Sequence, residues 1–178
     1  MDLNTGLKKR IIFCFYILIA SSFLDQITKF IAKISLPFND AISYLAGTLR
    51  FQLTHNNGAF LSLGASLPDE IRQFLLTVGI TIFLICLLGY ILLKKTITNF
   101  EIFSLSMILS GGMNNLFDRL YYHGYVVDFI NIGIGSLRTG IFNIADVFIM
   151  IGSILLLFIT YNNKDITLSC GNSITKKK

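Results

Sequence analysis

The sequence predicts a membrane protein, mainly α, with four transmembrane helices and a small external sheet. Three observations support this fold class. Hydrophobic residues make up 53% of the 178 residues and charged residues only 14%, whereas a soluble domain usually carries about a quarter charged residues. Four apolar segments are long enough to cross a bilayer, which takes about 20 residues. The basic residues cluster at the ends of these segments, as the positive-inside rule describes.

The four expected spans belong to one membrane-embedded domain, residues 1–162, followed by a polar tail, residues 163–178, that we expect to be disordered. The spans are 11–32, 71–93, 99–120 and 141–161. The first span follows three basic residues, like a cleavable signal peptide. However, its apolar run is too long for one and lacks a convincing cleavage site, so we interpret it as a retained helix.

Lysine and arginine bias sets the predicted orientation. Basic residues precede the first span, lie at Lys94 and Lys95 between the second and third, and end the chain. Both termini are therefore predicted to be cytoplasmic, and residues 33–70 and 121–140 to be external. The net charge of +5 forms no continuous patch, so we expect no nucleic-acid partner.

Both external segments contain strand patterns. Apolar and polar residues alternate from Thr48 to Thr54, which is typical of a half-buried strand, and Asn57-Gly58 then provides a turn signal. A second β-prone run extends from Tyr125 to Ile130. We expect a small sheet resting on the external membrane surface, with a strand pairing that the sequence leaves open.

Ionisable residues inside membrane spans are energetically costly and mark candidate functional sites. Such residues here are Asp25, Lys29, Glu101, Asp118, Arg119 and Asp146. Glu101 can reach water at the cytoplasmic start of its span. The three aspartates come from three different spans but share one predicted depth near the external surface, which makes them the leading candidates.

Two of these aspartates occur in the same local pattern. Asn115 precedes Asp118, and Asn143 precedes Asp146, each by three residues, which places an amide on the same helix face as its carboxylate. Two carboxylates close together in a low-dielectric site share a proton. Such a pair can activate water for peptide hydrolysis, and we predict Asp118 and Asp146 as the catalytic pair. Alternatively, Asn143 only caps its helix, and Asp118 only pairs with Arg119 at the interface.

The blocks that carry these residues resemble the lipoprotein signal peptidases, the bacterial type II signal peptidases, over nearly the whole chain. Five blocks occur in the family's order: Asp25-Gln26-Ile27-Thr28-Lys29; Asn56-Asn57-Gly58-Ala59; Gly111 to Arg119; Val127-Asp128-Phe129; and Phe142 to Asp146. Each block alone is a weak signal, but five in order are highly specific.

The resemblance implies an aspartyl endopeptidase that removes signal peptides from prolipoproteins, just before a diacylglyceryl-modified cysteine. It implies a four-helix fold with an external β-cradle in the cell inner membrane, and an active site near the outer face. Asp118 and Asp146 are expected to be catalytic. The residues expected to bind substrate or support the site are Asp25, Lys29, Asn56, Gly58, Asn115, Arg119, Asn143 and Ala145. Asp128 is interpreted as a structural acceptor, with direct contact to the site as the alternative.

No metal or cofactor is expected, because three cysteines and two histidines have no familiar zinc-site spacing. We expect a monomer whose partners are diacylglyceryl-modified prolipoproteins and membrane lipids.

Two departures from the family pattern are Phe60-Leu61 after the Asn-x-Gly-Ala block and Asn114 at a position that is often glycine. A Ser–Lys peptidase that uses Lys29 and a proton-coupled membrane transporter are the competing functions.

Overall fold

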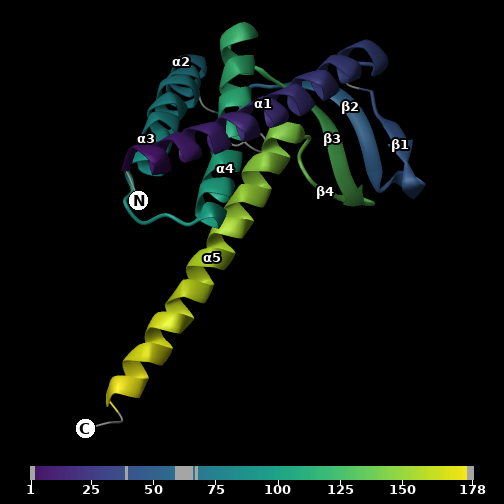
Figure 1. Ribbon diagram of the computed structural model, residues 1–178. Coiled ribbons are helices and arrows are strands. Elements are labelled where there is room, and N and C mark those ends of the chain that lie inside the picture. Colours follow the sequence, from purple (N-terminus) through teal and green to yellow (C-terminus); the bar gives the residue numbers. More distant parts are fainter. Residues whose placement is uncertain (1–2, 39, 59–65, 67, 176–178) are drawn as a thin grey trace.

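Helices and a small antiparallel sheet make up the structure, a computed structural model that describes residues 3–38, 40–58, 66 and 68–175 (Figure 1). Helix α1 spans Leu3–Ser35, α2 spans Asp69–Phe74, α3 spans Ile80–Leu93, α4 spans Asn99–Tyr121 and α5 spans Ile144–Thr175. A π-helical segment, η3 at Leu75–Gly79, joins α2 and α3 without a break, and η1 at Leu45–Gly47 is a short 3-10 turn. Phe60-Leu61, where the sequence departs from the family pattern, lies outside the described residues.

Three helical stretches of the described chain are long and apolar enough to cross a membrane: Gly6–Ser35, Asp69–Leu93 and Ile144–Asn162. They correspond to three of the four predicted spans. Helix α4 has 23 residues, which gives a length of about 35 Å at 1.5 Å per residue. It is more polar than the other three predicted spans because it lies inside the bundle. It packs against α5, α1 and α3 and buries three serines as well as the candidate-site residues.

Helix α5 continues well past the predicted fourth span. Its backbone is helical to Thr175, and Figure 1 shows it extending away from the other helices. The expectation of a disordered tail from residue 163 is therefore wrong up to Thr175. The segment contains no proline that would end the helix.

The sheet has four antiparallel strands in the order β1-β2-β3-β4. Strand β1 spans Ile42–Tyr44, β2 spans Leu49–Asn56, β3 spans Val126–Ile134 and β4 spans Leu137–Arg138. Both predicted strands are confirmed: the run from Thr48 to Thr54 covers most of β2, and the run from Tyr125 to Ile130 covers the first part of β3. Their register pairs Phe51 with Ile130 and Thr54 with Asp128, with an irregularity between the two pairs.

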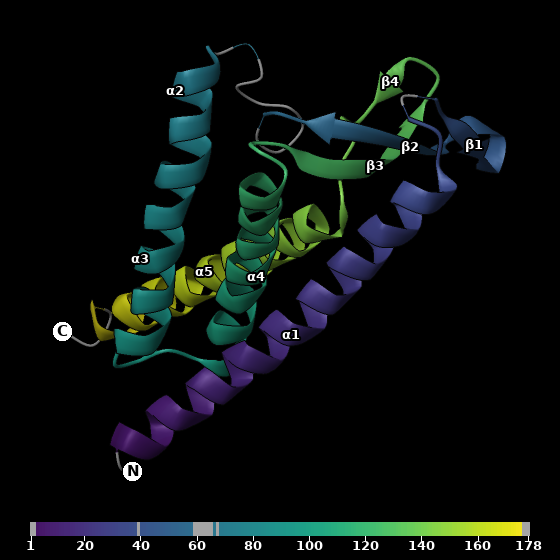
Figure 2. The same ribbon diagram turned by 90° about the horizontal axis from the view of Figure 1, so that it is seen from above.

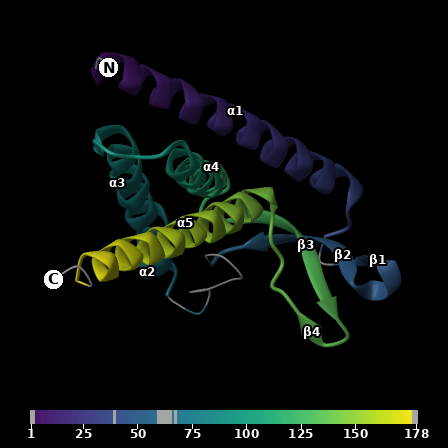
Figure 3. The same ribbon diagram turned by 60° about the horizontal axis from the view of Figure 1, so that its bottom comes forward.

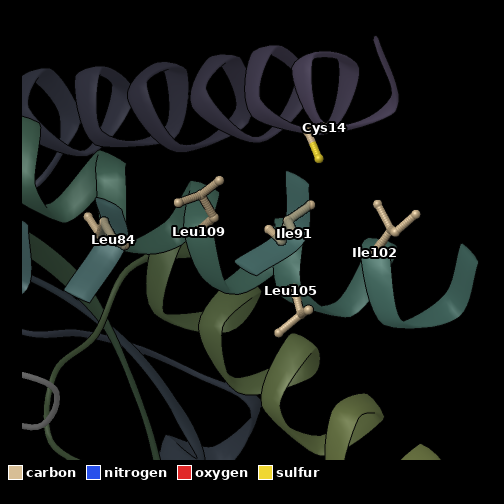
Figure 4. Close-up of a cluster of buried hydrophobic side chains, with 6 residues drawn as sticks. All are labelled: Cys14, Leu84, Ile91, Ile102, Leu105 and Leu109. Carbon is tan, nitrogen blue, oxygen red and sulfur yellow. The ribbon is translucent and has the colours of Figure 1, made fainter. Parts of the chain in front are cut away.

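Two clusters of buried apolar side chains hold these parts together. One joins α1, α3 and α4 through Cys14, Leu84, Ile91, Ile102, Leu105 and Leu109 (Figure 4). The other joins the end of α1 to the sheet through Ala32, Leu53, Val127 and Phe129. The polar candidate-site residues lie where α1, α4, α5 and β3 meet.

Figures 2 and 3 show that the sheet lies at one end of the bundle, while the N-terminus and the α3–α4 connection lie at the other end.

The α3–α4 connection is stabilised by a capping box at the start of α4. Glu101 accepts the Thr98 backbone N–H at 2.8 Å and donates its own backbone N–H to the Thr98 hydroxyl at 3.2 Å. Glu101 also pairs with Lys94 at 3.0 Å, so its contacts are structural, as its predicted position implied.

Candidate active site

A buried ion-pair cluster centred on Lys29 connects α1 to α4. The Lys29 Nζ lies 2.7 Å from Asp25 Oδ2 on the preceding turn of α1, and 2.8 Å from Asp118 Oδ2 on α4. All three side chains are buried. Since an unpaired buried charge is strongly unfavourable, this cluster is stable only while its opposite charges stay in contact. Lys29 is therefore an ion-pairing residue between α1 and α4.

The two carboxylates of this cluster also bind neighbouring elements. Asp118 accepts hydrogen bonds from the Gln26 side chain at 3.2 Å and from the Val127 backbone N–H at 3.2 Å. Asp25 accepts the backbone N–H of Ala145 at 2.9 Å. Through these contacts the cluster fixes α1, α4, β3 and the start of α5 relative to one another. Asp118 and Asp25 thus each combine the Lys29 cation with neutral N–H donors.

Asn143 and Asp146 form a reciprocal cap at the start of α5. The Asp146 backbone N–H donates to Asn143 Oδ1 at 3.0 Å, while the Asn143 backbone N–H donates to Asp146 Oδ2 at 3.2 Å. This is the capping-box arrangement, with asparagine and aspartate in its two positions. The Asn-x-x-Asp pattern here explains how the Asp146 carboxylate is held. Asn143 caps the helix, but it does more than cap, because its amide also donates to Asn115 and Asp128.

A chain of side-chain amides connects Asp146 to Asp128 on β3. Asn115 donates to Asp146 Oδ1 at 2.8 Å, and Asn143 donates to Asn115 Oδ1 at 3.1 Å and to Asp128 Oδ1 at 2.6 Å. Asn56 donates to Asp128 Oδ2 at 2.8 Å. Each carboxylate therefore accepts neutral amide donors. Among the described residues, neither carboxylate has an ion-pair partner.

The two Asn-x-x-Asp repeats are thus not equivalent. The sequence predicts that Asn115 lies beside Asp118, but the Asn115 amide donates to Asp146 instead. The amide that reaches Asp118 is that of Gln26. This difference arises because Asn115 faces the start of α5, while Asp118, one turn further along α4, faces Lys29 on α1.

Asp128 has an unusual protonation behaviour for a carboxyl group outside the helices. Burial, together with the negative charge of Asp146, raises the pKa of Asp128 to about 7, although the amide hydrogen bonds from Asn56 and Asn143 act in the opposite direction. A carboxyl group that keeps its proton near neutral pH, beside a second carboxylate, is the electrostatic signature of an acid pair.

Arg119 connects the β2 end to this site. Its guanidinium donates to the carbonyl oxygen of Gly58 at 2.8 Å and to that of Asn115 at 3.2 Å. Gly58 in turn donates its backbone N–H to Asn56 Oδ1 at 2.9 Å, so the turn that follows β2 is fixed beside Asp128. The predicted interfacial pair of Asp118 with Arg119 is not among the described ion pairs.

A cavity of about 160 Å³ opens beside Asp146 between α3, α4 and α5. Its polar lining consists of Asp146, Asn115 and Arg119, and its apolar lining of Ile80, Phe83, Leu84, Ile108, Gly112 and Ile149. The apolar part extends along membrane-spanning helices. The cavity can therefore hold an apolar chain while its polar end contacts the Asp146 carboxylate.

Close packing of α4 against α5 supports this arrangement. A Cβ atom at Gly111 would overlap the Ala145 carbonyl oxygen and come within 2.7 Å of the Ile149 side chain. The absence of a side chain at Gly111 therefore lets α4 approach the first turn of α5 closely enough for Asn115 to reach Asp146.

Comparison with known proteins gives a family for this arrangement. The sequence profile described as signal peptidase (SPase) II matches residues 17–172, which include every residue of the site described above. The chain belongs to the signal peptidase II family. It is therefore a member of a family of proteases, and the site is the candidate active site of a peptidase.

Individual relatives agree with this assignment. The chain is 39% identical to a lipoprotein signal peptidase of Caldicellulosiruptor bescii over 82% of its own length and 89% of the relative's. It is 33% identical to a lipoprotein signal peptidase of Treponema denticola over 71% of its own length and 76% of the relative's. Among solved structures, it resembles a bacterial membrane enzyme determined by the in meso method at 2.3 Å, with a TM-score of 0.74, 26% identity, and coverage of 85% of this chain and 88% of that one.

Family membership decides between the competing functions. Nothing supports the proton-coupled transporter, whose relay acids would be spread across the membrane depth. The acids here converge at the sheet end of the bundle instead. The Ser–Lys alternative also lacks support, because Lys29 is held by two carboxylates and, among the described residues, makes no hydrogen bond to a serine.

The structure brings all ten sequence-predicted site residues to one place, but it divides them into two groups. Asp25, Lys29, Asp118 and the Ala145 N–H form the ion-pair cluster. Asn56, Gly58, Asn115, Arg119, Asn143 and Asp146 surround the amide chain that ends at Asp128. Within the described residues no group of histidines, cysteines or acids has the arrangement of a metal site.

Sequence reasoning underestimated Asp128. Its position within an apolar β-run was a usable signal, because a charged residue in a strand that is otherwise buried needs specific partners. The contacts from Asn56 and Asn143 are those partners. Asp128 accepts hydrogen bonds from both, as the structural interpretation expected, and through Asn143 it also contacts the site, as the alternative expected.

Proposed function

We propose that the chain is a lipoprotein signal peptidase that hydrolyses the peptide bond just before the diacylglyceryl-modified cysteine of a prolipoprotein. The proposal rests on the family match and on the paired, amide-held carboxylates beside a cavity that extends along membrane-spanning helices. A substrate with an apolar signal helix and a lipid anchor suits a site built at the end of a helix bundle.

We further propose that Asp128 and Asp146 form the catalytic pair. The observation that carries this choice is the distribution of positive charge. Lys29 forms ion pairs with Asp25 and Asp118 at 2.7 and 2.8 Å, whereas the hydrogen bonds that Asp128 and Asp146 accept from the described residues come from neutral N–H donors. The original prediction of Asp118 as the partner of Asp146 is the alternative. It requires Asp118 to leave its contact with Lys29 during catalysis.

The chemistry follows from a pair that shares one proton. With a pKa raised to about 7, Asp128 holds the shared proton below neutral pH, and Asp146 is the base. Asp146 removes a proton from water, the water oxygen attacks the peptide carbonyl, and Asp128 donates its proton to the carbonyl oxygen. Collapse of the tetrahedral intermediate breaks the C–N bond, and the proton on Asp146 passes to the leaving amine. One of the two hydroxyl groups of the intermediate returns its proton to Asp128 as the new carboxylic acid forms.

The amides keep the two carboxylates in place during these steps. Asn143 bonds to Asp128 directly and to Asp146 through Asn115 and its own backbone. Neutral donors hold the carboxylates without adding a positive charge that would favour full ionisation of both. Arg119, through Gly58, positions the turn that follows Asn56 at the end of β2.

In the membrane, we propose four spans, with α4 as a membrane-crossing helix in addition to the three apolar stretches, and cytoplasmic N- and C-termini. Both the N-terminus and the α3–α4 connection lie at the end of the bundle opposite the sheet (Figure 2). The same end carries Arg10, Lys94 and Lys95, in agreement with the positive-inside rule. The active site then lies near the outer face of the bacterial inner membrane. We propose that the chain acts as a monomer surrounded by lipid.

Two synthetic substrates of identical sequence test the function, one with a diacylglyceryl group on the cysteine and one without. We expect purified protein to cut only the lipidated peptide, at the bond just before the cysteine, as read by mass spectrometry. Asp146→Asn is expected to abolish cleavage. Equal cleavage by this variant, or equal cleavage of both peptides, would disprove the proposal.

A further inference from the structure

A second cavity lies at the end of the bundle opposite the active site. It has a volume of about 360 Å³ and lies between the first turns of α1 and the start of α4. Its lining consists of Gly6, Lys9, Arg10, Phe13, Ile97, Asn99 and Ile102. None of these residues contributes to the peptidase site described above.

The lining separates into a polar part and an apolar part. Lys9, Arg10 and Asn99 supply cationic and amide donors, while Phe13, Ile97 and Ile102 supply apolar walls. Ile102 belongs to the buried cluster shared by α1, α3 and α4. A ligand that fits must therefore combine an anionic or hydrogen-bond-accepting group with an apolar chain.

The charge around this cavity is predominantly positive. The Arg10 guanidinium donates to the carbonyl oxygens of Lys94 at 2.6 Å and Lys95 at 3.3 Å, so neutral acceptors fix it in place and its charge is not cancelled by a carboxylate. Within the part of the chain that the structure describes, Lys9 has no ion-pair partner. The nearby acid, Glu101, is already paired with Lys94 at 3.0 Å.

We propose that this cavity binds an anionic phospholipid, with the phosphate at Lys9 and Arg10 and the start of an acyl chain against Phe13, Ile97 and Ile102. The position agrees with this ligand, because basic side chains next to the first apolar turn of a spanning helix lie at headgroup level. A positively charged peptide segment would be repelled. A free phosphate ion would satisfy the cations but leave the apolar walls without a partner.

Native mass spectrometry of the full chain in detergent tests this proposal with two lipids that have the same acyl chains. We expect phosphatidylglycerol to be retained at least about tenfold more strongly than phosphatidylcholine, because about two basic side chains face the phosphate. Lys9→Gln is expected to lower phosphatidylglycerol retention about fivefold. Lys8→Gln removes the same charge one residue away, outside the cavity lining, and is expected to leave retention unchanged.

Three outcomes would overturn the proposal. Equal retention of the two lipids would show no headgroup recognition. Equal losses in Lys9→Gln and Lys8→Gln would show diffuse attraction rather than a site. Displacement of phosphatidylglycerol by millimolar inorganic phosphate would show a site for the free anion. Because Lys9 is exposed and far from the carboxylates, peptidase activity in detergent is expected to be unchanged in Lys9→Gln, which confirms that the variant is folded.

Discussion

Replacement of Asp128 by asparagine separates its structural role from its catalytic role. The side chain keeps its shape, and its remaining oxygen can still accept from either Asn143, now at 2.6 Å, or Asn56, now at 2.8 Å. Its new NH₂ group faces the other donor, so one buried hydrogen bond is lost. Such a loss costs about 1–3 kcal/mol. The cost is partly offset because asparagine carries no charge that burial opposes.

The expected effect on catalysis is much larger. Loss of a positioned acid or base lowers the rate about 10²–10⁴-fold, which corresponds to about 3–5 kcal/mol in the activation free energy at 1.36 kcal/mol per tenfold change. The Asp128→Asn protein should therefore unfold at a slightly lower temperature than the unmodified protein but show almost no cleavage. Steady-state hydrolysis of a lipidated fluorogenic peptide in detergent measures the rate, and a thermal unfolding scan measures stability.

The result that would refute the reasoning is a folded Asp128→Asn protein with kcat/KM within about tenfold of the unmodified enzyme, less than the loss expected for a general acid or base. Asn56→Ala is the matched control, because it removes one hydrogen bond to the same carboxylate without removing the carboxylate. It should lower kcat/KM by much less than Asp128→Asn does.

Three further predictions concern charge, pH and packing. Lys29→Met leaves two buried carboxylates without their cation and should destabilise the fold by about 3–5 kcal/mol, measured by thermal unfolding. An acid with a folded pKa above its unfolded value binds its proton more tightly when folded. The pKa of Asp128 is raised from 3.8 to about 7, so kcat/KM should fall as pH rises through about 7, and the unfolding free energy should fall between these two pH values. Asp128→Asn should reduce that second change, and a stability profile unaffected by the substitution would contradict the assignment. Gly111→Ala forces a Cβ onto the Ala145 carbonyl and should lower both stability and activity. In Gly112→Ala the new Cβ meets mainly the flexible end of the Leu84 side chain, at 2.7 Å, so the effect should be milder. Thermal unfolding and cleavage rates should therefore show the larger loss for Gly111→Ala.

Much of this fold follows from local patterns in the sequence. Long apolar runs predict α1, the α2–α3 helix and α5, because only a helix satisfies its own backbone in lipid. Period-two alternation predicts β2. The depth of the acids predicts that Asp25, Asp118 and Asp146 converge, because their positions along three helices can be compared by the rise per residue.

The distribution of partners within the site could not be predicted in the same way. Spacing along α4 places Asn115 and Asp118 on one side of the helix, but the neighbouring helices decide which partner each one meets. Asn115 meets α5 and Asp118 meets Lys29. The sequence prediction named Asp118 and not Asp128, since the position of a residue in an external strand gives no depth that can be compared with the depths of the helical acids. The continuation of α5 to Thr175 was also not visible in the polarity of the tail.

The charge distribution around Lys29 allows one decisive comparison. Lys29→Met combined with Asp118→Asn removes an opposite pair and leaves the net charge of the cluster unchanged, because Asp25 keeps its carboxylate. If Asp118 serves only as an ion-pair partner, the double variant should cleave the lipidated peptide at the same bond and keep more than about a hundredth of the normal kcat. Removal of a catalytic acid or base usually lowers the rate by more than that. Cleavage that falls to the background rate in a folded double variant, together with residual activity in Asp128→Asn, would contradict the pairing of Asp128 with Asp146.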